Sequence, residues 1–212
     1  MKNQSREAHD KTMYNLHGLD FWKKHNQEHV DKVFDNEEVK VAQLLEKYPS
    51  IRKNAIDIGS GGGWMTSELA KRFENVYGIE PSSKAIELCK DLHKDKNITW
   101  IEGYAEEVLN SNDELPKSNV FINTCSVFIH LDDYCVVPTL KYINQNFTDS
   151  ILSFQEFWSE EKPFNQPLTN CRPKEWWKFH LSNWELDFHG PNMGSHGDFY
   201  KDFHKGIHGY KK

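Results

Sequence analysis

The chain has 212 residues, and its length, composition and charge exclude several classes of protein. Hydrophobic residues make up 37%, charged residues 27% and aromatic residues 13%, a profile that argues against disorder, collagen and coiled coil. The net charge of −6 disfavours nucleic acid as a partner, because nucleic-acid binders usually present a basic face. The mean hydropathy is −0.77, and the most apolar stretch, residues 119–131, is too short and too polar to span a bilayer. We therefore expect one α/β domain over residues 1–212 with neither nucleic acid nor a membrane as its partner.

The N-terminal sequence and the cysteines predict a cytoplasmic protein. Residues 1–7 lack the apolar region of a secretory signal. The four cysteines show no CxxC spacing, and three of them lie in apolar segments, as reduced packing residues do. They are Cys89, Cys125, Cys135 and Cys171. We expect a monomer or a homodimer.

The first part of the chain is polar and aromatic. Residues 1–36 contain Tyr14, His17, Trp22 and His25, and this arm is expected either to close over a substrate as a lid or to dock as a helix. A helical spacing of apolar residues then runs to Tyr48 and stops at a proline.

From residue 54 onward, short apolar runs alternate with helical patterns. This alternation predicts βαβ units and a Rossmann-like, doubly wound, mostly parallel sheet of seven strands with helices on both faces. The first five strands are expected at residues 54–58, 75–80, 98–102, 120–124 and 150–154, and the helices between them at 64–73, 82–92, 106–109 and 132–146.

After Trp158 the alternation loosens. Prolines punctuate residues 159–183, which we interpret as a lid insertion between the fifth and sixth strands, with a Trp-rich helix beginning near Pro173. Residues 184–189 and 203–210 are the expected closing strands.

The first strand ends in a glycine-rich turn, Gly59–Gly63, and the second ends in Glu80, 21 residues after Gly59. Glycine lets the backbone pass close to a ligand, and a strand-end carboxylate can accept hydrogen bonds from both hydroxyls of a ribose. The dinucleotide fingerprint needs a small residue at its last position, where this chain has Trp64. The pattern therefore favours a nucleoside cofactor without a pyrophosphate.

Four segments in this order resemble the class I S-adenosylmethionine-dependent methyltransferases. They are residues 55–64, 78–82, 102–108 and 122–131, and the resemblance covers about residues 50–158. It implies S-adenosyl-L-methionine as the cofactor and methyl transfer as the activity.

The resemblance also implies cofactor contacts at matching positions. Gly59, Ser60 and Gly61 would line the methionine portion, and Asp57 would hold that loop or the amino group. Glu80, followed by Pro81, would take the ribose. Ala105 would meet the adenine ring; Tyr104 replaces the usual Asp before it, so Glu106 or a backbone carbonyl would substitute. The resemblance places Thr124 in the lining of the cofactor pocket.

Two titratable residues are candidates for a general base. His130 follows the fourth strand, where a neutral imidazole could take a proton from an attacking hydroxyl or amine. Its simpler role is to pack or cap there. Glu156 follows the fifth strand and is either a second base or a solvated loop acid.

The remaining candidates are aromatic side chains and histidines. Tyr14, Trp22, Trp158 and Trp176 could stack on a substrate, although the last two could equally be core residues. The C-terminal third is rich in histidine, but nearby glycines disfavour a helix at His204 and His208 and no Cys or Asp cluster completes a ligand set, so no metal is expected.

The expected function is methyl transfer to an oxygen or nitrogen of a small-molecule acceptor, sugar-like or aromatic. A NAD(P)-binding oxidoreductase, a non-catalytic S-adenosylmethionine-binding protein and an aminopropyl transferase remain alternatives. The last would want an acidic polyamine channel, and no clear Asp cluster follows the fourth strand.

Overall fold

The computed structural model describes residues 44–94, 97–160, 164–166, 169–189 and 204–211. The expected N-terminal arm, with Tyr14 and Trp22, lies outside these residues. Residues 44–47 form a helical turn that ends before Pro49.

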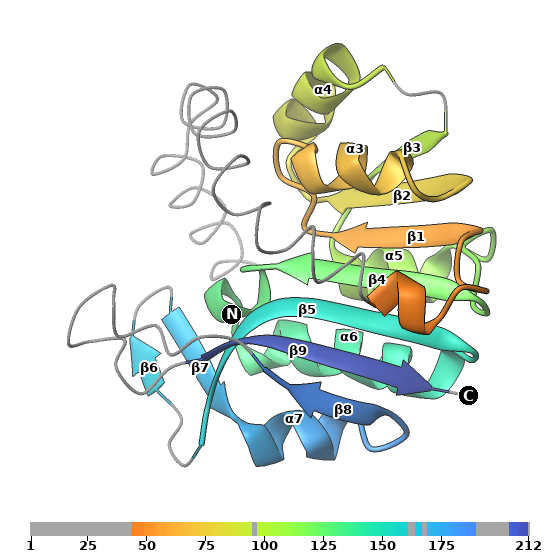
Figure 1. The fold of residues 1–212 in the computed structure, drawn as a ribbon. Coiled ribbons are helices and arrows are strands. Elements are labelled where there is room, and N and C mark those ends of the chain that lie inside the picture. The colour runs from red at the N-terminus through yellow and green to blue at the C-terminus, as the bar shows by residue number, and fades with distance from the viewer. Residues whose placement is uncertain (1–43, 95–96, 161–163, 167–168, 190–203, 212) are drawn as a thin grey trace.

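A nine-stranded sheet forms the centre of the molecule (Figure 1). Its main path runs in the order β3-β2-β1-β4-β5-β7-β6, and β9 pairs with both β5 and β8. The strands are β1 (Asn54–Ile58), β2 (Asn75–Glu80), β3 (Ile98–Glu102), β4 (Val120–Cys125), β5 (Ser150–Ser159), β6 (Phe164–Gln166), β7 (Thr169–Pro173), β8 (Glu185–Phe188) and β9 (His204–Lys211). The first five pair in parallel and β9 runs antiparallel to β5, so the expected doubly wound fold is confirmed.

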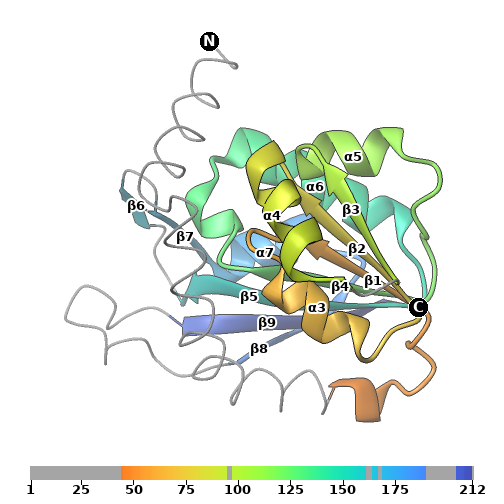
Figure 2. The same cartoon turned by 90° about the horizontal axis from the view of Figure 1, so that it is seen from above.

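Helices cover both faces of the sheet. Among the described residues they are α3 (Trp64–Ala70), α4 (Ser83–Leu92), α5 (Ala105–Ser111), α6 (Asp133–Asn146) and α7 (Lys174–His180), with a 3-10 turn η1 (Phe128–His130) after β4. Figures 1 and 2 place α3 on one face of the sheet and α5 and α6 on the other. The alternation of buried strand residues explains this arrangement, because Ile56 and Ile122 pack with α5 and α6 whereas Ala55 and Phe121 pack with α3.

The sheet differs from the predicted seven strands through a hairpin in the expected lid insertion. β6 and β7 form this hairpin, and the end of β7 pairs in parallel with the last two residues of β5. β5 is five residues longer than the predicted strand at 150–154. The apolar run ends there, but the strand continues through mixed polar and aromatic residues. The following helix, α7, is seven residues long and ends at His180.

The parallel strands β1, β2, β3, β4 and β5 end at one edge of the sheet, where ligands of doubly wound folds bind (Figure 1). None of the helices in the described part of the chain is long and apolar enough to cross a membrane.

Candidate active site

The glycine-rich turn folds tightly against the end of β2. The amides of Gly59 and Ser60 both donate to the carbonyl of Ile79, at 2.8 and 3.0 Å. Gly59 and Gly63 adopt φ angles of 70° and 82°, which disfavour any residue with a Cβ. A Cβ on Gly59 would also lie 2.5 Å from a methyl of Val127. The turn thus requires glycine at both positions.

Helix α4 holds the turn from the other side. The Cys89 thiol donates to the Gly61 carbonyl at 3.1 Å, and the Nε2 of His93 lies 2.9 Å from the Gly62 carbonyl. Trp64 packs edge-on against the His93 ring, with centroids 4.8 Å apart. The indole that departs from the dinucleotide fingerprint is therefore a packing residue for the turn.

Glu80 lies beside the turn with both carboxylate oxygens engaged. One accepts the amide of Gly61 at 3.1 Å and the other accepts the amide of Ser82 at 3.0 Å. These two bonds fix the carboxylate at the end of β2, and a carboxylate can accept about four hydrogen bonds in all. Glu80 is therefore held at the carboxyl edge of the sheet, beside the glycine-rich turn.

Asp57 is a buried carboxylate under the turn. It accepts the hydroxyl of Thr66 in α3 at 2.6 Å and the amide of Asn123 in β4 at 2.8 Å. Burial raises its pKa from 3.8 to about 6, and the two hydrogen bonds only partly oppose the desolvation. Asp57 thus fastens β1 to α3 and β4 rather than contacting the loop backbone.

This raised pKa gives a testable dependence of stability on pH. Because the folded pKa exceeds the unfolded one, the stabilisation by protonated Asp57 is complete below about pH 4 and lost as the pH rises through about 6. As the pH rises through this range, the free energy of unfolding of the parent protein should fall by about 3 kcal/mol more than that of the Asp57→Asn variant. Urea unfolding at pH 4, 5, 6 and 7 measures the difference, and a difference that does not change with pH would refute it.

The residues expected near adenine lie at the start of α5. Tyr104 is the residue before the helix, and Ala105 and Glu106 occupy its first turn, all half-buried. The first amides of a helix lack partners within it, so the Ala105 amide is suitably placed for a ligand. Pro81 is exposed after β2, and Ser60 is buried with no hydrogen-bond partner for its Oγ.

Glu156 is neither a loop residue nor a solvated acid. It lies inside β5, is 1% exposed, and accepts three hydrogen bonds from the β4 end and the loop after it. The donors are the Thr124 hydroxyl at 2.9 Å and the amides of Val127 and Ile129 at 2.8 and 3.1 Å. Its oxygens are committed to the protein itself, so the structure favours a positioning role over that of a base. Thr124, expected to line the cofactor pocket, is fully buried and donates its hydroxyl to Glu156.

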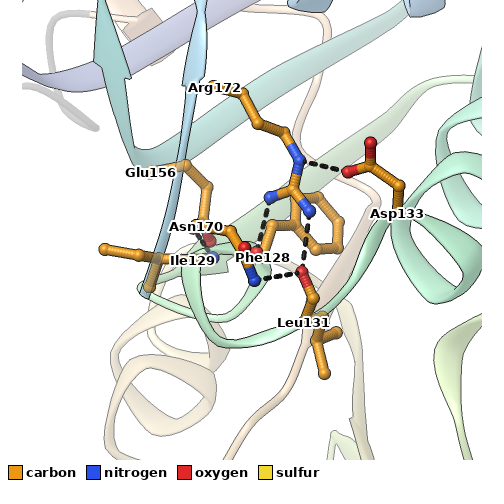
Figure 3. Close-up of polar contacts among 7 residues, drawn as sticks. All are labelled: Phe128, Ile129, Leu131, Asp133, Glu156, Asn170 and Arg172. Carbon is orange, nitrogen blue, oxygen red and sulfur yellow. Dashed lines mark hydrogen bonds and ion pairs between the residues drawn. The ribbon is translucent and has the colours of Figure 1, made fainter. Parts of the chain in front are cut away.

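Arg172, which the sequence analysis did not identify, holds the same loop from the other side (Figure 3). Its guanidinium donates to the carbonyls of Phe128 and Leu131, both at 2.7 Å, and to Asp133 at 2.8 Å. Asn170 adds a bond to the Leu131 carbonyl at 3.0 Å. Both come from β7, so the inserted hairpin supports the loop. No local sequence pattern signals this role, because the contacts span about 40 residues.

His130 ends the 3-10 turn between these two supports. It is half-buried, and its amide donates to the Val127 carbonyl at 3.0 Å. Glu156 and Arg172 thus take up the amides and carbonyls on either side of His130, which fixes its backbone at the carboxyl edge of β4.

The two substrate candidates that lie within the described residues, Trp158 and Trp176, both pack against protein groups. Trp158 is a core residue, 3% exposed, and its indole N–H donates to the Gly206 carbonyl at 3.0 Å. Trp176 packs in α7 under Arg172, whose guanidinium carbon lies 4.8 Å from the ring centroid. Trp158 therefore has the core role that the sequence also allowed, and substrate stacking on Trp176 stays a prediction.

His204 and His208 lie in strand β9 rather than in a helix. His208 is part of β9 and its ring lies 3.8 Å from that of His189. Within the described ranges, no group of three or more His, Cys, Asp or Glu side chains is arranged to hold a metal ion.

The sequence matches known proteins over the same region. A family model described as a methyltransferase domain matches residues 56–135. A probable ribosomal RNA small subunit methyltransferase A of Thermococcus gammatolerans is 30% identical over 122 residues, 58% of this chain and 38% of that protein. A probable cobalt-precorrin-6B C(15)-methyltransferase of Methanocaldococcus jannaschii is 44% identical over 70 residues, 32% of this chain and 37% of its own length. The chain thus spans well under half of these curated relatives.

Solved structures share the fold at low sequence identity. The YcgJ protein of Bacillus subtilis superposes with a TM-score of 0.63 at 12% identity, covering 82% of this chain and 99% of that one. An amino pentose methyltransferase of Micromonospora echinaspora superposes with a TM-score of 0.62 at 11% identity, covering 84% and 91%. Residues 56–135 of this chain are thus similar to a methyltransferase domain, and the chain shares the Rossmann-like fold of a methyltransferase of known structure.

Proposed function

We propose that the chain transfers a methyl group from S-adenosyl-L-methionine to an oxygen or nitrogen atom of a small-molecule acceptor, with sugar-like or aromatic acceptors favoured. The observation that carries this proposal is the bare glycine turn beside Glu80, fixed from both sides at the carboxyl edge of the sheet. Similar solved structures support the cofactor, among them the amino pentose methyltransferase with S-adenosylmethionine bound.

The residues present fit such a cofactor. A Cβ on Gly59 or Gly63 would meet neighbouring side chains at 2.5 and 2.6 Å, so only glycine keeps the turn in this shape. The buried Oγ of Ser60 lacks a partner, which a polar ligand group would supply. Glu80 would accept the ribose hydroxyls, and the Ala105 amide would face the adenine. Trp64 fills the position where a dinucleotide site needs a small residue.

The bound cofactor would supply an activated methyl group for an in-line displacement. The chain's own residues then have to align the acceptor and exclude water from it. His130 would accept the proton that a hydroxyl acceptor loses, because its loop lies next to the glycine turn, with Val127 packed over Gly59. Glu156 and Arg172 would hold that loop in place.

Replacing His130 by glutamine is expected to lower the turnover number for a hydroxyl acceptor by about 100-fold, the lower end of general-base contributions. The dissociation constant of S-adenosylhomocysteine should change less than twofold, because the turn and Glu80 are untouched. Steady-state assays and calorimetry measure the two quantities. Equal losses in both would reduce His130 to a packing residue.

Competing functions make different predictions. An NAD(P)-dependent oxidoreductase would bind NADH, and a non-catalytic binding protein would bind S-adenosylhomocysteine without turnover. One relative is a probable ribosomal RNA methyltransferase, which suggests ribosomal RNA as a substrate, whereas the net charge of −6 favours a small molecule.

The deciding experiment combines calorimetry with product analysis. We expect S-adenosylhomocysteine to bind and NADH not to bind. We also expect S-adenosylhomocysteine to form from the cofactor only when a small-molecule acceptor is added. Absence of S-adenosylhomocysteine binding would refute the cofactor assignment, and turnover with ribosomal RNA but with no small molecule would refute the acceptor class.

A further inference from the structure

A row of buried polar side chains crosses the sheet beside the glycine turn. Asp57 of β1 pairs in register with Asn123 of β4, which pairs with Ser153 of β5. Gln155 follows two residues later and pairs with Cys125 at the end of β4. Asn123, Ser153 and Gln155 are at most 1% exposed.

The side chains in this row point to one face of the sheet. Phe154 packs against Phe128 and Trp177 on the face of α6 and α7, with ring centroids 5.5 and 6.3 Å away. Because side chains alternate along a strand, its neighbours Ser153 and Gln155 point to the opposite face, that of α3. Asn123 faces the same way, since it donates to Asp57, which is bonded to Thr66 of α3.

Three polar atoms in this row have no hydrogen-bond partner among the residues that the structure describes. They are the Oδ1 of Asn123, the Oγ of Ser153 and the Nε2 of Gln155. An unsatisfied buried polar atom costs free energy comparable to a lost hydrogen bond, and native proteins satisfy nearly all of them. Three such atoms lie in two adjacent strands, next to Asp57, whose carboxylate accepts two side-chain hydrogen bonds. This contrast within one row indicates that the three atoms meet a further polar group.

The missing partner would lie next to the proposed site of methyl transfer. The Gln155 carbonyl accepts the amide of Ser126, in the loop that leads to His130. The three atoms offer one acceptor, one donor and one hydroxyl that can act as either, with no net charge among them. This set matches neighbouring hydroxyl groups of a neutral ligand better than a phosphate or a carboxylate.

We propose that Asn123, Ser153 and Gln155 bind the methyl acceptor through its uncharged hydroxyl groups, so that the acceptor is a sugar or a similar polyol. This inference rests on the proposed function and specifies its substrate class.

The test uses Gln155→Met, which removes the polar atom at similar volume, and Ser153→Ala. Gln145→Met, at an exposed position of α6, is the matched control. The probes are methyl glucoside, xylose and glucosamine, with catechol as the aromatic comparison, titrated by calorimetry into protein saturated with S-adenosylhomocysteine. We expect at least one sugar to bind the parent protein, at least tenfold weaker binding to both row variants, and no change in the control.

A second measurement separates binding from folding. If the three atoms await a ligand, the unliganded row variants should melt at the same or a higher temperature than the parent, since removing an unsatisfied polar atom relieves its cost. Lower melting temperatures together with unchanged sugar binding would overturn the proposal, as would binding of catechol but of no sugar. Failure of S-adenosylhomocysteine to bind would refute the proposed function. If a sugar still bound the parent protein in that case, and bound the row variants at least tenfold more weakly, the sugar site itself would be supported.

Discussion

Replacing Glu156 by glutamine is expected to lower the free energy of unfolding by about 3 kcal/mol, the upper end for leaving a buried hydrogen-bonding group unsatisfied. The carboxylate accepts the Thr124 hydroxyl and two backbone amides and has almost no contact with solvent. Glutamine has the same shape, but its NH₂ group would face a backbone N–H where an oxygen is needed. Urea unfolding at pH 7 measures the change.

Glu160→Gln is the matched control, because this exposed acid lies four residues further along and pairs with Lys174 at the surface. Its effect should stay within about 0.5 kcal/mol, as for most surface substitutions. Amide exchange adds a local readout, since the Val127 and Ile129 amides should exchange faster in Glu156→Gln. Stability within 0.5 kcal/mol of the parent protein and unaltered exchange would show that Glu156 does not hold the loop.

Replacing Glu80 by alanine is expected to weaken S-adenosylhomocysteine binding by about 1–3 kcal/mol, which is roughly 5- to 150-fold in the dissociation constant. The variant loses the acceptor for the ribose hydroxyls and also the bond that fixes the Gly61 amide. Glu80→Gln keeps one acceptor oxygen and should fall between the two. Calorimetric titration measures all three proteins.

Glu74→Ala provides the control, because this exposed acid precedes β2 at the opposite end of the strand from Glu80. Its dissociation constant should equal that of the parent protein. If Glu80→Ala binds S-adenosylhomocysteine as tightly as the control does, the ribose does not contact this carboxylate.

The sequence determined the central fold and the cofactor side of the candidate site. The turn Gly59–Gly63 and Glu80 could be predicted because each follows a short apolar strand, and parallel strands bring their carboxyl ends to one edge. The roles of the turn and of Glu80 depend on local backbone conformation and on the order of strands along the chain, and both can be predicted from the sequence.

Only the tertiary structure decided what holds the loop after β4. Glu156 follows an apolar run and was taken for the start of a loop, yet its strand continues to Ser159 because β7 and β9 pair with it there. Arg172 gave no signal at all, since its partners at Phe128 and Leu131 lie about 40 residues earlier. Burial of a polar side chain depends on such distant partners, and neither spacing nor composition records them.

Distant partners also decide whether an aromatic residue belongs to the core or to a binding site. Composition placed Trp158 and Trp176 among substrate candidates, whereas the structure packs the first under β9 and the second under Arg172. A tryptophan has the same local sequence signature in a core and in a binding site. Which of the two it occupies is decided by the elements that the fold brings over it, because only they determine whether its ring faces protein or ligand.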